Sequence, residues 1–294
     1  VMGTEPSFVF ALLIVGMGML AGILLSYGLD IPVYEEKIRV PASEMNFKRR
    51  LNVADDLFSV VFFPIIAYIA VSGSMELLDE NTVDARWSES TPSSYWFMYL
   101  YVSRMLLHIP VQTILLWDNE KGLLWQMTAH HIFSTVCFAN ALVVHHMHFW
   151  GLLAGCCELT TGPLSILGIS LNCFPPDHYY AKIVTAFAGF ALWLGFLVFR
   201  IALFPVWLWI FHSDIVTYPE QTWAIMSGPE RVLYPAVIML LWGLSVMWMI
   251  PITKGLIKAL GLNPVIPATE RETEKLLPLT RRPSSYASPL ITYP

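Results

Sequence analysis

Charged residues are scarce in this sequence. Asp, Glu, Lys and Arg make up 13% of its 294 residues, whereas a soluble domain carries about 25%. Hydrophobic residues make up 56%, and they fall in blocks as long as the ~20 residues that a helix needs to cross a bilayer. The composition excludes an ordinary soluble domain and predicts an all-α polytopic membrane protein.

Cysteines and clustered basic residues are also few. The four cysteines lie within or beside apolar segments, so they do not indicate a disulfide framework. There is no Asn-x-Ser/Thr sequon for glycosylation. No run of Lys and Arg is suited to nucleic acid, and we therefore expect no nucleic-acid partner.

Apolar blocks recur along the chain with short polar connections between them. They predict about seven transmembrane helices, at residues 8–27, 53–72, 95–117, 123–144, 149–171, 183–211 and 232–252. We expect three parts: residues 1–47 (a first helix and a basic connection), a transmembrane domain at 48–260, and a tail at 261–294. The tail is polar and rich in Pro and Ser, which predicts disorder when it is alone.

The basic residues are distributed unequally between the two sides of these spans. Thirteen of the 17 Lys and Arg fall on the side of the first, third and fifth connections and the C-terminus, and only Arg86 and Arg231 on the other. The positive-inside rule therefore places the C-terminus in the cytosol or an equivalent compartment. The remaining two, Arg104 and Arg200, fall inside predicted spans.

Ionisable residues inside the spans gather at one depth. With about 1.5 Å of rise per residue, the following residues lie in one layer near the middle of the membrane: Arg104, His108, His130, His131, Glu158 and Arg200. Ionisable residues inside a membrane usually mark a functional site. Asp55 and Asp56 follow the basic connection, at the mouth of this layer. The layer predicts a cavity that opens to the positive side and takes up water or a lipid headgroup.

Helical phase extends the predicted lipid site. One face of the third span carries Tyr101, Arg104, His108 and Gln112. On the fourth span, His131 shares a face with Ser134 and Thr135. The expected lipid-binding residues are Tyr101, Arg104, His108, Ser134, Thr135, Glu158 and Arg200. A structural ion pair of Glu158 with Arg104 or Arg200 is the alternative.

The eight histidines raise the question of a metal site. Histidine ligands on one helix face are spaced three to five residues apart, and neither His130–His131 nor the cluster His145, His146 and His148 has that spacing. The two clusters lie about 22 Å apart along a helix. We expect no metal, and no cofactor other than a bound phospholipid or sphingolipid. The second cluster is interpreted as interfacial polar residues.

Three segments resemble the TLC-domain family, which includes ceramide synthases and translocon-associated membrane proteins. They are AHHIFST at 129–135, ELTTGPLSI at 158–166 and LVFRIALFP at 197–205. The resemblance covers roughly residues 48–258. It implies a barrel of six helices around a lipid cavity, here with one additional helix.

The resemblance also implies roles for the first histidine pair. In ceramide synthases the paired histidines take part in acyl transfer from acyl-CoA to a sphingoid amine, so His130 and His131 become the catalytic candidates, one as a general base or acyl acceptor. The synthases have a further His-Asp that this chain lacks, and the chain looks closer to the TLC proteins without synthase chemistry. Binding or handling of a lipid is therefore the first prediction, and an acyl-CoA-dependent acyltransferase is an alternative.

A second alternative is an accessory structural subunit of a large membrane complex. It depends on the tail and on the pairs Gly18–Gly22 and Gly151–Gly155, whose spacing permits close helix packing with another membrane protein. Membrane lipids are the other expected partners. The resemblance favours the endoplasmic reticulum, with a mitochondrial or other organellar membrane as the alternative.

Overall fold

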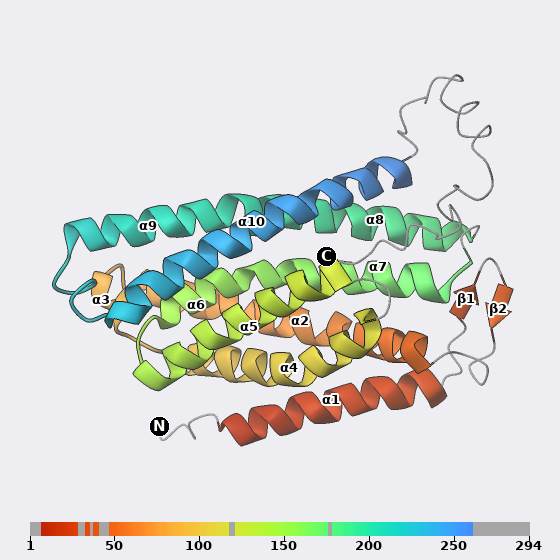
Figure 1. Cartoon of the computed structure of the whole chain (residues 1–294), viewed down its shortest axis with the longest axis horizontal. Coiled ribbons are helices and arrows are strands. Elements are labelled where there is room, and N and C mark those ends of the chain that lie inside the picture. The colour runs from red at the N-terminus through yellow and green to blue at the C-terminus, as the bar shows by residue number, and fades with distance from the viewer. Residues whose placement is uncertain are drawn as a thin grey trace.

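The computed structural model of the chain describes residues 7–28, 33–35, 38–40, 47–117, 121–175 and 178–260. Long helices run side by side along one axis, and a short antiparallel pair of strands lies at one end (Figure 1). The predicted tail at 261–294 lies outside the described residues. The helical content follows from the apolar composition, because a helix satisfies its own backbone hydrogen bonds within a membrane.

The elements follow one another with short connections. In chain order they are α1 (Phe8–Gly28), β1 (Val33–Glu35), β2 (Ile38–Val40), α2 (Phe47–Asp79), α3 (Val83–Trp87), α4 (Pro92–Leu116), α5 (Lys121–Val144), α6 (His148–Gly155), the 3-10 helix η2 (Cys156–Thr160), α7 (Thr161–Cys173), α8 (Tyr179–Phe196), the π-helix η3 (Leu197–Ala202), α9 (Leu203–Thr217) and α10 (Gly228–Ala259).

Six helical segments of the described chain are long and apolar enough to cross a membrane. They are Phe8–Gly28, Phe47–Asp79, Lys121–Val144, His148–Cys173, Tyr179–Thr217 and Gly228–Ala259. These segments confirm the predicted all-α polytopic membrane protein. The third expected span is present as the 25-residue helix α4, but it is not among the six. Its sequence contains Arg104, His108 and Gln112, which make it less apolar.

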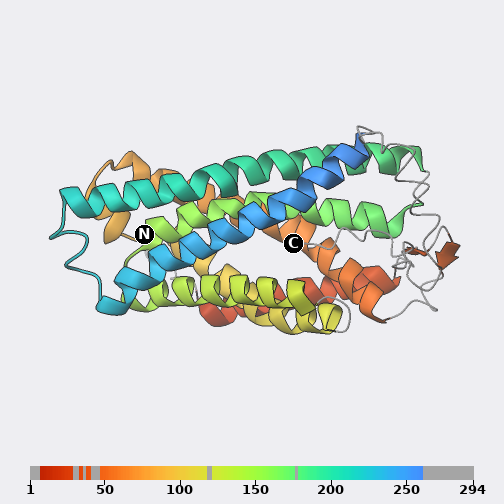
Figure 2. The ribbon, with the colours of Figure 1, turned by 45° about the horizontal axis from the view of Figure 1, so that its top comes forward.

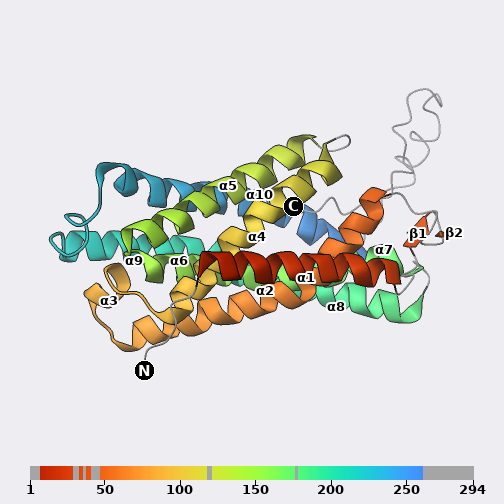
Figure 3. The same ribbon diagram turned by 90° about the horizontal axis from the view of Figure 1, so that it is seen from below.

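Six helical segments form a closed ring. Going round it, α2 contacts α4, α4 contacts α5, α5 contacts α10, α10 contacts α8, α8 contacts α7, and α7 contacts α2 again. Figure 2 shows α10 crossing obliquely between α5 and the α8–α9 segment. Helix α1 lies outside the ring, where it packs against α2 and α4 (Figure 3). The arrangement is a six-helix barrel with one additional helix.

The two glycine pairs are used inside the chain. On α1, Gly18 and Gly22 face α2, and a side chain at Gly22 would lie 2.6 Å from the carbonyl oxygen of Ala54. On α6, a side chain at Gly151 would meet Met98 and Phe138, and one at Gly155 would meet Phe97. The expected use of these faces for another membrane protein is therefore corrected, because the chain itself covers them.

Aromatic side chains fill the end of the ring at which α9 ends and α10 begins. The rings of Trp87, Trp150 and Phe211 pack with centroids 4.8–5.4 Å apart. The carboxylate of Asp214 accepts two hydrogen bonds from Arg86, at 2.7 and 2.8 Å, and one from the indole of Trp87 at 2.9 Å. The bonds from Arg86 to Asp214 raise the pKa of this guanidinium. This end of the barrel is closed by packing.

The second histidine cluster lies at the same end, in the turn between α5 and α6. His145 has a left-handed φ of 58° and Met147 one of 68°, a conformation that turns the chain back. The three imidazoles contact other helices. On α4, the hydroxyl of Tyr95 lies 3.1 Å from Nδ1 of His145, and Oγ of Ser94 lies 2.7 Å from Nδ1 of His148. On α10, Glu230 lies 3.1 Å from Nε2 of His146. The cluster thus joins α4, α6 and α10 at the end of the barrel.

Candidate functional site

A cavity of about 160 Å³ lies inside the ring, and every one of its six helical segments contributes lining residues. Its polar lining consists of Asn52, Asp55, Asp56, Ser59, Arg104, His108, Gln112, His130, His131, Glu158, Thr160, Thr161, Ser165 and Arg200. A cavity needs about 10–15 Å³ to hold a single water. The cavity therefore has room for a headgroup-sized polar moiety, but not for a whole phospholipid.

Arg104 is held by a carboxylate on the neighbouring helix. Its guanidinium, on α4, donates to Asp55 of α2 at 2.8 Å and to Ser59 at 3.1 Å. Nδ1 of His108, one turn further along α4, lies 3.4 Å from the same carboxylate oxygen of Asp55. A buried charge is costly without a partner, and Asp55 supplies that partner for the 1% exposed Arg104 side chain.

Glu158 and Arg200 lie in the two irregular turns of the ring. Glu158 belongs to the 3-10 helix η2 and Arg200 to the π-helix η3, and these two segments contact each other. Such departures from the α-helix often occur at functional sites. Nε of Arg200 donates to Thr160 at 3.1 Å, and Glu158 accepts a 2.7 Å hydrogen bond from Thr161.

Neither of these buried charges has a counter-ion in the described part of the chain. Glu158 is 4% exposed and Arg200 is 5% exposed, yet no ion pair joins either of them to an oppositely charged residue there. The alternative of a structural ion pair between Glu158 and an arginine is therefore corrected. Arg104 pairs with Asp55 instead, because α2 and α4 are neighbours in the ring.

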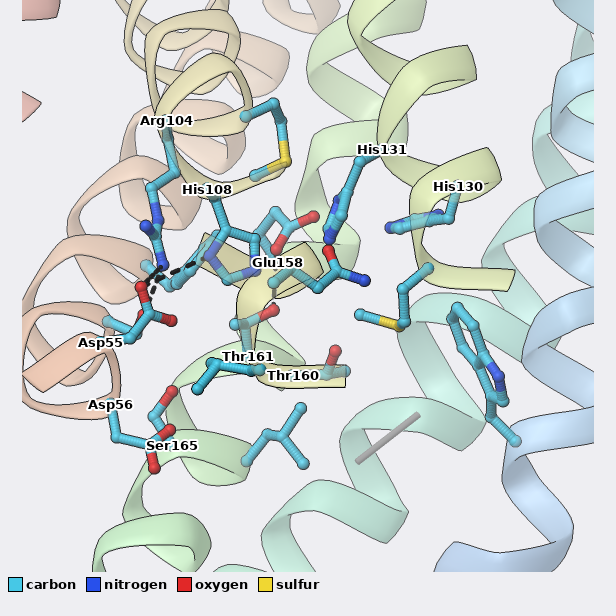
Figure 4. Close-up of a pocket in the computed structure, with 18 of the residues that line it drawn as sticks. Asp55, Asp56, Arg104, His108, His130, His131, Glu158, Thr160, Thr161 and Ser165 are labelled. Carbon is cyan, nitrogen blue, oxygen red and sulfur yellow. Dashed lines mark hydrogen bonds and ion pairs between the residues drawn. The ribbon is translucent and has the colours of Figure 1, made fainter. Parts of the chain in front are cut away.

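Several buried polar atoms around the cavity have no hydrogen-bond partner among the described residues. They include both ring nitrogens of His131, Nδ1 of His130, and the amide nitrogen and oxygen of Gln112. The ring of His131 lies 5.3 Å from that of His108 and 5.1 Å from that of His130. Figure 4 shows His108, His131 and Glu158 converging on the same space. Buried polar groups are nearly always hydrogen-bonded, so these atoms are free to bind a ligand or water.

The structure brings most of the predicted site residues together. Six of them line the cavity: Arg104, His108, His130, His131, Glu158 and Arg200. The other three, Tyr101, Ser134 and Thr135, are not part of its lining. Tyr101 packs edge-on against Phe138 at 4.7 Å, and Ser134 donates to the carbonyl oxygen of His130 at 2.8 Å.

Sequence reasoning missed other lining residues. Asp55 was placed at the cavity mouth, and nothing in the sequence pairs it with Arg104. Gln112 was expected on the helix face of His108, four residues away, but not among the lipid-binding residues. Trp248, whose ring lies 5.7 Å from that of His130, comes from α10 and had no signal beyond its place in an apolar span.

No group of three or more His, Cys, Asp or Glu side chains in the described residues is arranged to hold a metal ion. The two histidine clusters lie apart, one beside the cavity and the other at the closed end of the barrel.

Comparison with known families gives a match to the TLC domain over residues 53–254. The chain belongs to the TLC-domain family. The matched region contains every lining residue of the cavity except Asn52 and excludes α1, in agreement with the six-helix ring and its outer helix. No curated protein and no solved structure matches the chain. Membership places this TLC-domain protein among membrane proteins with lipid-related roles.

Proposed function

We propose that this TLC-domain protein binds a membrane lipid by its polar headgroup inside the six-helix cavity. The observation that carries the proposal is the set of unpartnered buried polar atoms on Gln112, His130 and His131, all of which line one cavity. Apolar lining residues, among them Leu115 and Leu164, complement the carbon chain next to the headgroup. Because the cavity admits only a headgroup-sized moiety, the rest of the lipid extends out of it.

The first test of lipid binding is the substitution His131→Ala. It removes two unpartnered nitrogens from the cavity, so the lipids that co-purify with the protein should change in amount or kind. The measurement is mass spectrometry of lipids extracted from the purified protein. His145→Ala is the matched control, because this exposed histidine contacts Tyr95 at the closed end of the barrel. Identical lipid profiles for His131→Ala and the wild type would argue against the site.

Acyl transfer from acyl-CoA is the second candidate function. A specific arrangement favours it: the carboxylate of Asp55 contacts His108, and the His108 ring lies edge-on to that of His131. A carboxylate that orients an imidazole is typical of general-base catalysis. An enzyme should transfer a labelled acyl group from acyl-CoA to a lipid acceptor, and His131→Ala should abolish the product while the fold remains intact. Absence of transfer by the wild type with a panel of amine and hydroxyl acceptors would remove this candidate.

The accessory-subunit alternative now depends on the tail, which lies outside the described residues. It predicts migration in a complex of several hundred kilodaltons after gentle detergent extraction, and release when residues 262–294 are deleted. Autonomous lipid binding predicts a particle near the mass of the 33.3 kDa chain or its dimer plus detergent. The endoplasmic reticulum is the membrane that we propose, on the ground of the family alone.

A further inference from the structure

Arg200 and Glu158 line the cavity, and neither forms an ion pair with another residue of the described chain. The charge of Arg104 is balanced by Asp55 at 2.8 Å. By contrast, the hydrogen bonds of Arg200 and Glu158 go to the hydroxyls of Thr160 and Thr161 within the described chain. Burying two charges without partners is costly, so a ligand that carries both a negative and a positive group would match the site better than a ligand of one charge.

Arg200 suits the negative group. A guanidinium binds phosphate and carboxylate oxygens through paired N–H donors, and in Arg200 only Nε is hydrogen-bonded to another residue of the described chain. The π-helical turn holds this side chain over the ring of Phe196, with Cζ 4.9 Å from the ring centroid. The guanidinium is thus fixed in the cavity with its terminal nitrogens available.

The surroundings of Glu158 distinguish between kinds of positive group. A primary ammonium has three N–H donors, and the cavity offers acceptors: the Glu158 carboxylate, Oε1 of Gln112, and a ring nitrogen of His130 or His131. A trimethylammonium group has no N–H donor and is instead bound by aromatic faces. Three aromatic residues other than histidine line the cavity, and each already packs against a polar side chain. Phe196 is covered by Arg200, and Phe63 lies 5.8 Å from the guanidinium of Arg104. The ring of Trp248 packs edge-on with that of His130 at 5.7 Å.

We propose that the cavity selects lipids whose headgroup is the phosphate ester of a primary amine, with the phosphate on Arg200 and the ammonium at Glu158. The assignment rests on the proposed lipid-binding function and specifies its ligand class. Because Glu158 and Arg200 come from adjacent irregular turns that contact each other, a headgroup with a short link between its phosphate and amine reaches both.

A methylation series of one lipid tests this assignment without any variant. Phosphatidylethanolamine, its N-methyl and N,N-dimethyl derivatives, and phosphatidylcholine carry the same net charge and lose N–H donors one at a time. With identical acyl chains, each is titrated against the purified full chain, and bound lipid is measured by native mass spectrometry. Affinity should fall along the series, with phosphatidylethanolamine bound about tenfold more tightly than phosphatidylcholine, since a hydrogen bond to a charged group is the main difference.

The variant Glu158→Gln gives the second measurement. It keeps the size of the side chain and removes its charge, so the preference for the primary amine should shrink toward equal binding. Glu76→Gln is the matched control, because Glu76 is exposed on α2 away from the cavity and its substitution should leave the preference unchanged. The wild-type series decides the question even if Glu158→Gln does not fold.

The outcomes separate the ligand class from lipid binding itself. Equal affinity along the series would overturn the headgroup assignment, and so would stronger binding of anionic phosphatidylglycerol. If His131→Ala still weakens binding in either case, lipid binding itself stays in place. Binding of every lipid that is insensitive to His131→Ala would overturn both proposals. A falling series that Glu158→Gln flattens supports both.

Discussion

Each buried charge in the cavity is stabilised by a few neighbouring side chains. Arg104 illustrates this dependence: Asp55 supplies its ion pair, Ser59 a hydrogen bond at 3.1 Å, and Phe58 a ring face at 5.2 Å from Cζ. Without the Asp55 carboxylate, the Arg104 guanidinium would lose its ion pair. Its side chain is only 1% exposed, so bulk water would not replace that partner. The stability of the barrel at the level of the cavity therefore depends on Asp55.

We predict that Asp55→Asn lowers the free energy of unfolding by about 3–5 kcal/mol, the usual cost of breaking a buried ion pair on one side. Thermal unfolding in detergent micelles measures it. Asp79→Asn, at the exposed end of α2, is the control and should change the midpoint little. Combining Asp55→Asn with Arg104→Gln should recover part of the loss. A midpoint equal to that of the wild type for Asp55→Asn would contradict the pairing.

At the scale of helices, close approach through glycine decides which elements pack together. Helix α6 enters the ring beside α4 because Gly155 leaves room for the ring of Phe97, which is fully buried. The 3-10 helix η2 starts at the next residue, so this contact also positions Glu158. An added side chain at Gly155 would have to displace Phe97 or move η2.

Accordingly, Gly155→Ala should destabilise the protein by about 1–3 kcal/mol, the typical cost of overpacking a core. Gly243→Ala is the matched control on α10, where the added carbon would lie within 4 Å of no described atom beyond the adjacent backbone of its own helix. That control should be neutral or slightly stabilising, because alanine favours a helix by up to about 1 kcal/mol over glycine. Both are read from thermal midpoints in detergent. Equal thermal midpoints for the two variants would show that Phe97 moves aside with no loss of stability, which would contradict the prediction.

For the whole molecule, the ring and the charge distribution define an axis across the membrane. The cavity is lined by the first half of α5 and the second half of α4, so it lies toward one end of the barrel. The aromatic cluster closes the other end. The α9–α10 connection lies at the opposite end of the molecule from the start of α8 (Figure 1). Basic residues at the starts of α5 and α8 thus predict that the cavity faces the positive side of the membrane.

Single cysteines test this orientation. Cysteine at Lys121 or Lys182 should react with a membrane-impermeant maleimide only from the cytosolic or equivalent side, and cysteine at Glu220 only from the other. All three positions are exposed, while the four native cysteines are buried and should give little background. Labelling of Glu220→Cys from the same side as Lys182→Cys would contradict the predicted topology.

The class, the family and the positions of the long helices follow from the sequence alone, and the depth of the polar layer is its prediction. Depth can be read from sequence because the rise of a helix and the thickness of a bilayer are fixed. Arg104, His108, His131, Glu158 and Arg200 therefore proved to line one cavity.

Which of these groups contact one another depends on how the helices pack. The pairing of Arg104 with Asp55 depends on α2 lying beside α4, and a sequence does not state the order of helices in a ring. The turns that carry Glu158 and Arg200 depart from 3.6 residues per turn, so a helical wheel misplaces the side chains that follow. Tyr101, Ser134 and Thr135 have a suitable phase but do not line the cavity: Tyr101 packs against Phe138 of α5, and Ser134 donates to the carbonyl oxygen of His130 in its own helix. Packing between helices, which no single helix specifies, makes that choice.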